Sequence, residues 1–406
     1  MDIFEKCELN PYVNQMKAQG LYPYFHQITG KQHSEVIMDG RRTIMLGSNN
    51  YLGLTSDERI IKAGKEAIQK YGSGCSGSRF LNGTLELHVL LEKELKEFFG
   101  KQAAITYSTG FQTNLGIISA VAGQRDILIY DKNNHASLID AARLSGAKLR
   151  RYEHNDMRHL ERILQNCPDQ AGKLIVVDGV FSMKGDLANL PEIVRLKNLY
   201  GARLMVDDSH GAGVMGKTGR GTGEHFGLQH EIDLYMATFS KAFASLGGFV
   251  AADERIIEYV RHVSRPFIFS ASVTPANAAV VLEALQILGE EPDRVARVNQ
   301  NADYMRANLK RLGIQAIHSE APIIPIITNE MIGTFEITHE LLLDGVYVNP
   351  VIPPAIPEGS CLLRTSYMAT HTKEQMDYAL DKFETVFKAY QRQHTRKEIY
   401  HGRHPI

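Results

Sequence analysis

The segment RLMVDDSHGAG, residues 203–213, decides the fold, because an apolar run typical of a buried strand stops at two aspartates, a serine and a histidine. The same pattern recurs in LIVVDG at 174–179 and in DLYMATFS at 233–240. Between them, LPEIVRLKNLY at 190–200 has apolar residues at helical spacing, with Pro191 suited to a first helical turn. This alternation predicts βαβ units and an α/β fold on a mainly parallel sheet. Ligands bind at the carboxyl ends of strands in such sheets, so the polar residues that close these runs are candidates for chemistry.

The alternation of strands and helices divides the chain into three expected regions. Residues 1–48 lack it and are expected to form an arm with a small hairpin, VIMDGRRTIML, that turns at Asp39-Gly40. Residues 49–290 are expected to form a large domain, and residues 291–406 a smaller α+β domain with a basic tail. The last region is predicted to contain helices over 294–312, 334–344 and 372–391 and a strand over 323–327.

Composition excludes several classes of protein. The chain has 406 residues, 44% of them hydrophobic and 22% charged, which suits a packed core and not a disordered protein. Its 45 basic and 46 acidic side chains nearly cancel, which argues against a nucleic-acid binder. The longest apolar stretches, such as 321–327, are too short to span a bilayer. The four cysteines form no CxxC pair or Cys/His cluster, so we expect neither a disulfide nor a metal site.

The two ends of the chain bear on its location. The N-terminal segment MDIFEKCELN carries acids where a secretory signal has a basic region and an apolar run, so we expect a cytoplasmic protein. The tail QRQHTRKEIYHGRHPI is basic and polar. We expect the tail to be solvated, and peripheral contact with an anionic membrane surface is the alternative.

A lysine stands where one of the predicted strands ends. Lys241 follows Thr238 and Ser240 and is soon followed by the pair Gly247-Gly248. Most lysines are solvated surface charges, but a lysine held among apolar residues has a lowered pKa and can form a Schiff base with an aldehyde. The hydroxyls of Thr238 and Ser240 are then candidates to hold a phosphate.

Asp207 and His210 follow another strand. Asp207 comes directly after an apolar run, so it must be paired or it would be neutral. A protonated pyridine nitrogen is a suitable partner, and the resulting ion pair makes the ring an electron sink. His210 is placed to reach a phenolic oxygen on such a ring. Taken alone, the Asp-Asp-Ser-His turn is equally well explained as a helix cap or a metal ligand.

Three further turns complete the set. In YSTGFQTN, a glycine stands directly before an expected helix, and the free amides of Gly110 and Phe111 would form a phosphate cradle, although many helices begin after glycine. His135, in DKNNHAS after a strand over 127–130, is placed to stack on a flat ring, and a loop histidine satisfied by its neighbours is the alternative. Ser182, in VFSMKGD, closes another strand. An amine, a ring counter-ion, a stacking imidazole, hydroxyls and a phosphate cradle are together what pyridoxal 5'-phosphate (PLP) requires.

Six segments carry a resemblance to a known family. SNNYLGL, GSGCSGSRFLNGT, DKNNHASLIDA, VDDSHGAGVMGKTGRG, TFSKAFASLGGF and LLRTSYMATHT occur in this order and resemble the α-oxoamine synthases of the fold-type I PLP enzymes, from about residue 45 to 380. The resemblance implies an aspartate aminotransferase-like fold. It also implies a C-acyltransferase that joins an amino acid to an acyl-CoA and releases carbon dioxide and CoA.

The resemblance implies a role for each candidate residue. Lys241 would form the Schiff base and remove the substrate's Cα proton, and Asp207 would pair with the pyridine nitrogen. The other implied roles are His210 and Ser182 beside the ring oxygen, His135 stacked on the ring and donating to the developing oxyanion, Gly110, Phe111 and Thr238 at the phosphate, Ser270 at the phosphate of the neighbouring subunit's cofactor, Asn49 near the substrate and Arg364 on the substrate carboxylate.

Four activities compete within the family. TFSKAFASLGGF and PPAIPEGSCLLRTSYMATHT resemble the serine palmitoyltransferases, whereas the aminoketobutyrate CoA ligases, aminooxononanoate synthases and aminolevulinate synthases typically have TLGKA around the lysine. VDDSHGAG and SRPFIFSAS look like the ligases, so glycine C-acetyltransferase activity is the alternative. The favoured branch implies L-serine and a long-chain acyl-CoA as substrates, and a homodimer with its active site at the subunit interface. A non-catalytic partner subunit is the alternative of a different class, and the intact Lys241, Asp207 and His210 argue against it.

Overall fold

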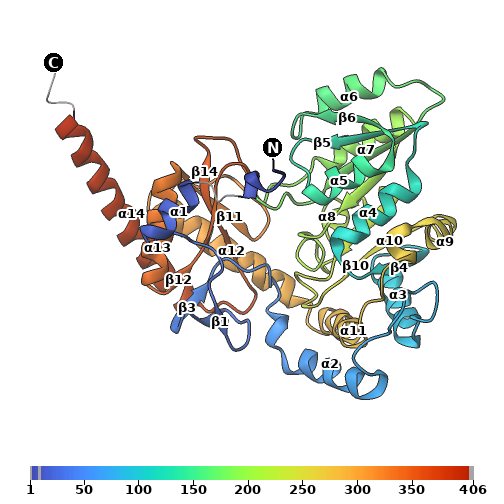
Figure 1. The fold of residues 1–406 in the computed structure, drawn as a ribbon, viewed down its shortest axis with the longest axis horizontal. Helices are drawn as coiled ribbons and strands as arrows, with labels where there is room; N and C mark the ends of the chain where they lie inside the picture. The colour runs from blue at the N-terminus through green and yellow to red at the C-terminus, as the bar shows by residue number, and fades with distance from the viewer. Residues whose placement is uncertain (1, 8–10, 402–406) are drawn as a thin grey trace.

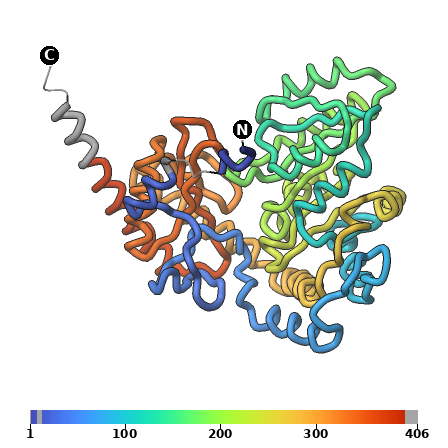
Figure 2. The backbone as a smooth tube through the Cα atoms, viewed as in Figure 1, coloured from blue at the N-terminus to red at the C-terminus, as the bar shows by residue number. Residues whose placement is uncertain are grey.

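The computed structural model describes residues 2–7 and 11–401, which form two lobes (Figure 1). The larger lobe contains a central sheet with helices on both faces. The smaller lobe brings the N-terminal segment, blue in Figure 2, against the C-terminal third of the chain, orange and red. The two lobes are therefore not simple consecutive halves of the sequence.

The large lobe is built on a seven-stranded sheet of order β4-β10-β9-β8-β7-β5-β6. Its strands are β4 (Ala103–Tyr107), β5 (Asp126–Asp131), β6 (Lys148–Tyr152), β7 (Gly172–Asp178), β8 (Arg203–Asp207), β9 (Leu234–Thr238) and β10 (Gly248–Ala252). The pairs from β6 through β9 are parallel, and β10 is antiparallel to both of its neighbours. The predicted α/β fold with a mainly parallel sheet is confirmed.

Helices cover both faces because the central strands are apolar on both sides. Ile175 and Val177 of β7 belong to one core cluster, whereas Leu174 and Val176 belong to the cluster on the opposite face. The helices of the large lobe are α2 (Glu58–Tyr71), α3 (Glu86–Phe98), α4 (Gly110–Val121), α5 (Ala136–Ser145), α6 (Met157–Gln165), α7 (Leu190–Leu199), α8 (Thr222–His225), α9 (Glu254–Val263), α10 (Arg265–Ile268) and α11 (Pro275–Glu290), with short 3-10 turns at Leu54–Ser56 and Gln229–Glu231. Side chains that alternate between two covered faces explain why these strands read as continuous apolar runs.

The small lobe contains two sheets and three long helices. One sheet pairs β11 (Ile323–Asn329), β14 (Cys361–Ser366) and β13 (Asn349–Val351), and the helices are α12 (Asp293–Arg311), α13 (Met331–Leu343) and α14 (Lys373–His401). The other sheet joins β1 (Ile28–Thr29), β2 (Glu35–Met38) and β3 (Arg41–Met45) to β12 (Val346–Tyr347), and the N-terminal elements also include Glu5–Cys7 and α1 (Pro11–Ala18).

The hairpin predicted near the N-terminus is confirmed, and it joins a distant strand. β2 and β3 turn at Asp39 and Gly40, both with positive φ. β3 then pairs in parallel with β12, a contact that no local pattern predicts. The final helix was expected to end near Gln391 and instead runs to His401, since no proline or glycine interrupts it before Gly402. The side chains of the basic tail beyond Arg392 lie outside the described residues.

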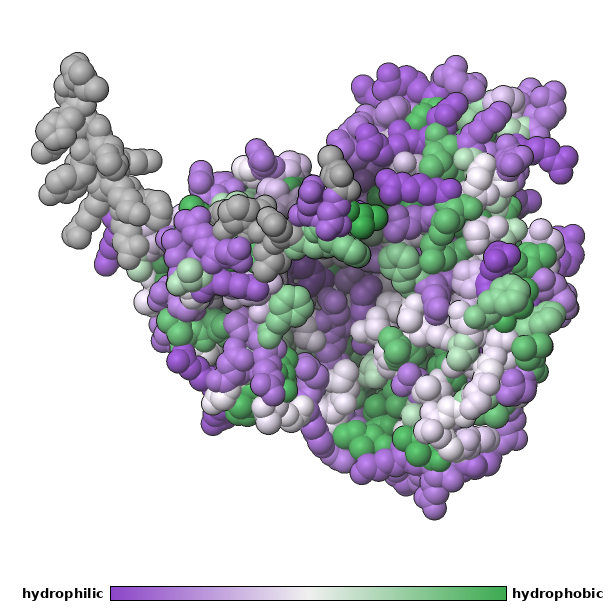
Figure 3. Space-filling model, viewed as in Figure 1, coloured by the Kyte–Doolittle hydropathy of each residue, from purple (hydrophilic) through white to green (hydrophobic). Residues whose placement is uncertain are grey.

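The space between the lobes is open. Residues of both lobes, among them Lys217 and His318, line a cavity of about 790 Å³. The space-filling view is hollowed between the lobes (Figure 3). Within residues 2–7 and 11–401, no helix combines the length and apolar character that a bilayer span requires, and no three His, Cys, Asp or Glu side chains are grouped to hold a metal ion.

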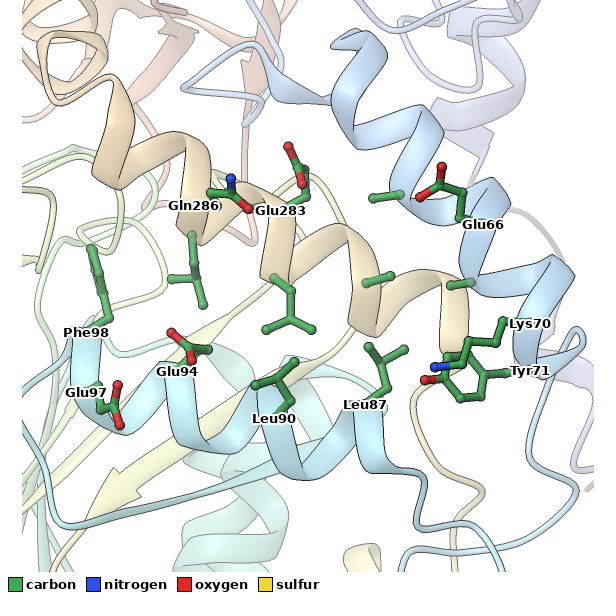
Figure 4. A pocket seen from close by; sticks show the side chains of 15 residues that line it. Glu66, Lys70, Tyr71, Leu87, Leu90, Glu94, Glu97, Phe98, Glu283 and Gln286 are labelled. Carbon is green, nitrogen blue, oxygen red and sulfur yellow. The ribbon is translucent and has the colours of Figure 1, made fainter.

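A separate groove of about 650 Å³ lies between α2, α3 and α11 (Figure 4). Leu87 and Leu90 line it with other apolar side chains, and several glutamates surround it. Its lysine, Lys70, is already paired with Glu86 at 2.7 Å. This lining does not suit a phosphate or a carboxylate, so the groove is not the site of the chemistry that the sequence predicts.

Candidate active site

The turns after β7, β8 and β9 meet at the same edge of the large sheet. Asp178 and Asp207 are register partners at the ends of β7 and β8, and Asp207 is in register with Met236 of β9. Lys241 follows β9 closely in the chain, and the electric fields of Asp178 and Asp207 both act on it. The parallel sheet thus brings two carboxylates and an amine from three separate segments to one place.

Lys241 lies in surroundings that favour the neutral amine. Burial lowers its pKa to about 8, although Asp207 and Asp178 act in the opposite direction. A primary amine with this pKa is substantially neutral near pH 8, and the neutral form is the nucleophile that attacks an aldehyde. The chemistry proposed for Lys241 from sequence is therefore compatible with its environment.

Asp207 is a buried carboxylate, 4% exposed, held by neutral donors. Its Oδ2 accepts from Asn114 Nδ2 at 2.6 Å, and its Oδ1 accepts from the Ser209 amide at 3.1 Å. No lysine, arginine or histidine of the described residues forms a salt bridge with it. A buried carboxylate in this state stabilises a cation placed beside it, such as a protonated ring nitrogen.

The second aspartate of the turn has a different task. Asp208 is fully buried, and its Oδ2 accepts from the Thr222 amide at 2.7 Å and from the Tyr235 hydroxyl at 2.9 Å. Burial raises the pKa of Asp208 to about 6. Asp208 therefore holds the turn between β8 and α8 in place, while Asp207 faces the lysine.

His135 is the N-cap residue of α5, and hydrogen bonds hold both its backbone amide and its ring. Its amide donates to Asp178 Oδ2 at 2.6 Å, and its Nδ1 accepts from the Ser137 amide at 3.3 Å. Burial lowers the pKa of His135, so the ring is neutral near pH 8. Because Nδ1 accepts a backbone hydrogen bond, the neutral ring carries its proton on Nε2.

His210 is connected to the small lobe through Tyr51. The Tyr51 hydroxyl lies 2.7 Å from His210 Nδ1 and also accepts from Arg364 Nη2 at 3.3 Å. Burial lowers the pKa of His210 well below its ordinary value, so the ring is neutral. Its Nδ1 can then accept a hydrogen bond from the Tyr51 hydroxyl. The neutral ring then keeps its own proton on Nε2, where it can be donated to an oxygen acceptor.

Arg364 of β14 forms hydrogen bonds with two other candidate residues, Ser182 and Asn49. Its Nε donates to the Ser182 carbonyl at 2.6 Å, and its Nη2 donates to Asn49 Oδ1 at 2.9 Å. Arg364 is 6% exposed, and the described residues offer no hydrogen-bond partner to its Nη1. Ser182 lies past the end of β7, in the turn closed by the bridge between Val180 and Leu187.

The start of α4 and the end of β9 approach each other closely. Gly110 is the first residue of α4, so the helix begins one position earlier than expected, and Thr109 caps it by accepting from the Gln112 amide at 3.1 Å. A Cβ on Gly110 would lie 2.7 Å from the Thr238 Cβ. Thr238 Oγ1 is 2.9 Å from Ser240 Oγ. Unpaired helix amides and two hydroxyls therefore meet in one small space.

Phe111 and Ser270 lie at the same end of α4. Phe111 is 42% exposed, and its ring centre lies 6.5 Å from that of His135. Ser270 Oγ accepts from Gln112 Nε2 at 3.2 Å, so Ser270 stands beside the α4 terminus of its own chain. Asn49 lies between β3 and the 3-10 turn at Leu54–Ser56, and Ser270 follows α10; the other candidate residues lie at the ends of strands of the large sheet, on the turns and helix starts that follow them, or on β14.

Asp178 and Tyr51 belong to the site and were not among the sequence candidates. Asp178 ends the predicted strand LIVVDG, and that polar ending was the signal for it. Burial, together with repulsion from Asp207, raises the pKa of Asp178 well above its ordinary value. Tyr51 stands inside the quoted segment SNNYLGL, but its contact with His210 spans 159 positions and leaves no local signal.

The residues present fit PLP. Asp207 offers a buried negative charge without an ion pair, Lys241 offers an amine of lowered pKa, and Gly110 leaves room that a side chain would fill. These are the groups needed by a cationic pyridine nitrogen, an aldehyde and a phosphate respectively. The fit rests on three independent features of the chain.

Comparisons with known proteins agree with this chemistry. Residues 41–383 match the family model for aminotransferase class I and II. A serine palmitoyltransferase of Bacteroides thetaiotaomicron is 54% identical over 372 residues, covering 92% of this chain and 94% of that protein. The serine palmitoyltransferase of Sphingobacterium spiritivorum is 50% identical over 376 residues, covering 93% and 94% respectively. A high-resolution structure of SPT with a PLP internal aldimine has a TM-score of 0.94 at 36% identity, and it covers 96% of this chain and 100% of that one.

Proposed function

The chain belongs to the α-oxoamine synthases of the class I and II aminotransferase family and is most like serine palmitoyltransferase, and from this premise we propose that it condenses L-serine with palmitoyl-CoA. The products are 3-oxosphinganine, CoA and carbon dioxide. The observation that carries the proposal is the meeting of Lys241, Asp207 and Arg364 at one site, in a chain more than half identical to a named serine palmitoyltransferase.

PLP, when bound, supplies an electron sink for the bonding electrons at the amino acid's Cα. We assign Asp207 to hold the proton on the ring nitrogen, since its carboxylate is buried and has no cationic partner among the described residues. As a free amine, Lys241 takes the Cα proton of serine, for which a pKa of about 8 is well matched. Gly110, Phe111, Thr238 and Ser240 are assigned to the phosphate.

Arg364 is assigned to bind the serine carboxylate. Ser182 and Asn49 fix two of its nitrogens, so the guanidinium is oriented before substrate arrives. Such preorganisation reduces the entropy lost when a carboxylate forms charge-assisted hydrogen bonds. Asn49 is therefore a support for Arg364 beside the substrate.

The two histidines are assigned as donors. His135 carries its proton on Nε2 and is placed to donate to the oxygen that becomes negative when the thioester is attacked. His210, with its Nδ1 occupied by Tyr51, would donate through Nε2 to the phenolic oxygen of bound PLP, and Ser182 is assigned to the same oxygen. Both assignments depend on neutral rings, as the lowered pKa values of the two histidines favour.

We further propose a homodimer whose active site lies at the subunit interface. Ser272 Oγ donates to the carbonyls of Gly77 and Gly83, which ties the segment around Ser270 to the loop that contains Leu81. Phe269 and Leu81 on these segments are each 75% exposed, beside the α4 terminus. Apolar side chains this exposed next to a buried polar site favour coverage by a second subunit. Size-exclusion chromatography with light scattering tests this, and a monomeric active enzyme would contradict it.

We propose a cytoplasmic location, with any membrane contact peripheral. The substrate's acyl chain and the product are lipids, and the tail beyond Lys388 is basic. Sedimentation with anionic and with neutral vesicles tests this, using the full chain and a chain that ends at residue 390. If the tail mediates membrane contact, the full chain sediments with the vesicles and the shortened chain does not. If there is no contact, neither chain sediments.

CoA release by the PLP-loaded protein tests the proposed activity. Palmitoyl-CoA is supplied with serine, glycine or alanine in parallel, and acetyl-CoA with glycine serves as the control. We expect turnover with serine and the long-chain thioester only, and loss of that turnover in Lys241→Ala. Turnover with glycine and acetyl-CoA would instead assign the chain to the ligase branch, and a Lys241→Ala protein as active as its parent would refute the catalytic assignment.

A further inference from the structure

His154 lies between two carboxylates, just outside the site described above. Its Nδ1 is 2.9 Å from Asp131 Oδ1, and its Nε2 is 2.6 Å from Asp186 Oδ2. Ionised carboxylates only accept hydrogen bonds, so both ring nitrogens must donate. The geometry therefore requires the doubly protonated, positively charged ring.

The charges around His154 stabilise this form. Burial alone would lower the pKa of His154, but hydrogen bonds and attraction from Asp131 and Asp186 more than offset it and raise the pKa to about 9. The uncharged ring of Phe181 packs edge-on against the His154 ring, and the two ring centres are 4.5 Å apart. The neighbouring charges Lys132 and Glu153, which directly follow β5 and β6, pair with each other at the surface, with Nζ and Oε2 2.9 Å apart.

Each carboxylate belongs to a turn that carries part of the active site. Asp131 ends β5, its carbonyl accepts from the Asn134 amide at 3.2 Å, and His135 follows directly. Asp131 is also fully buried and accepts from the amides of Asn133 and Asn155 at 2.8 and 2.9 Å. His154 is therefore connected to the turn in which His135 caps α5.

Asp186 belongs to the turn that supports Arg364. Its carbonyl accepts from the Phe181 amide at 2.9 Å, which closes the turn around Ser182. The Ser182 carbonyl accepts from Arg364 Nε at 2.6 Å. A movement of Asp186 would thus displace the carbonyl that orients the guanidinium.

We propose that His154, as a cation held between Asp131 and Asp186, is a positioning residue that fixes the Ser182 turn and Arg364 relative to His135. This rests on the proposed function, in which Arg364 binds the serine carboxylate. His154 touches neither substrate nor cofactor in this role. Its removal frees the Ser182 turn and weakens serine binding more than it slows the chemistry.

The arrangement of His154 between Asp131 and Asp186, which we call the clamp, is also sensitive to pH. A histidine whose pKa is raised on folding contributes its full stabilisation below the ordinary pKa and loses it as pH rises through the folded value. Loss of the proton near pH 9 leaves one carboxylate without a donor. The KM for serine of the parent enzyme should therefore rise above pH 9.

The test compares His154→Gln with His26→Gln in the PLP-loaded enzyme. His26 is the matched control, because its Nδ1 is also 2.6 Å from a carboxylate, Asp39, in the N-terminal hairpin. At pH 8 we expect the KM for serine to rise about tenfold or more in His154→Gln, with a smaller fall in kcat and no change in the control. The variant's KM should also lose its rise above pH 9. A KM within twofold of the parent, or an unchanged alkaline rise, overturns the proposal.

A second variant and a second readout keep the test independent of folding and of the substrate. Asp186→Asn retains the pair between His154 and buried Asp131, and it should raise the KM for serine and shift its alkaline rise to lower pH. The melting temperature of the PLP-free protein is measured from pH 7 to 10, and its fall near pH 9 should be smaller in both variants. If the parent releases no CoA with serine, the proposed function fails, whereas an unchanged pH dependence of melting in the variants refutes the clamp alone.

Discussion

Gly110→Ala tests the phosphate cradle directly. The added Cβ would lie 2.7 Å from the Thr238 Cβ and 2.8 Å from Thr238 Oγ1. Carbon atoms in contact are normally about 3.5–4.0 Å apart, so Thr238 or the start of α4 must move by roughly 1 Å. Overpacking of this kind costs about 1–3 kcal/mol. If the strain falls on the bound state, PLP affinity drops by about tenfold for each 1.4 kcal/mol.

The matched control is Gly289→Ala. Gly289 also lies in a helix, α11, but apart from its chain neighbours and its own helix backbone no atom lies within 4 Å of the position its Cβ would take. Alanine is favoured over glycine in a helix by about 1 kcal/mol, so this variant should be as stable as the parent or slightly more stable. It should bind PLP like the parent.

The assay is titration of each PLP-free protein with PLP, followed by the visible absorption of the lysine-bound cofactor, with thermal melting in parallel. Gly110→Ala should bind PLP at least tenfold more weakly, while Gly289→Ala is unchanged. A Gly110→Ala protein that binds PLP within twofold of the parent would show that the meeting of α4 and β9 is not the phosphate site.

Three further predictions concern buried polar groups. Tyr51→Phe leaves His210 without its hydroxyl partner and should cost about 1–3 kcal/mol of stability, measured by urea unfolding, with reduced kcat/KM for serine; equal activity would remove Tyr51 from the site. The Arg79 guanidinium lies 2.6 Å from the buried carboxylate of Glu92, and Arg79→Met removes this main partner. The free energy of unfolding should fall by about 3 kcal/mol. A fall below about 1 kcal/mol would show that solvent or Arg261 replaces Arg79. Because the pKa of Lys241 is lowered, the rate of PLP attachment to the cofactor-free protein should increase by about fivefold between pH 7 and pH 8 and level off above pH 9. Stopped-flow absorbance measures this rate. A rate that still rises steeply at pH 10 would refute the lowered pKa.

Local patterns of the sequence were sufficient to predict the central strands of the large lobe. The apolar runs that end in Asp178, Asp207 and Thr238 became β7, β8 and β9, because side chains buried on both faces of a parallel sheet must be apolar along the whole strand. The polar residues at their ends follow from the same rule, since a parallel sheet brings all its carboxyl ends to one edge. Lys241 and Asp207 could therefore be found without coordinates.

Contacts between distant segments required the tertiary structure. Arg364 meets Ser182 across 182 positions and Asn49 across 315, and β3 pairs with β12. Neither propensity nor periodicity encodes such pairs, because both describe a residue and its near neighbours only. The two aspartates of the β8 turn illustrate the same limit: their letters are identical, and the direction of the turn decides which one holds the backbone and which one faces Lys241.

The sequence by itself determined the fold class, the chemistry of the turns and the residue types of the site. Only the tertiary structure decided their partners: Tyr51 for His210, the Ser182 carbonyl for Arg364, and two carboxylates for His154. The physical reason is that apolar patterning specifies which face of an element is buried, whereas hydrogen-bond partners depend on how the faces of separate elements pack together.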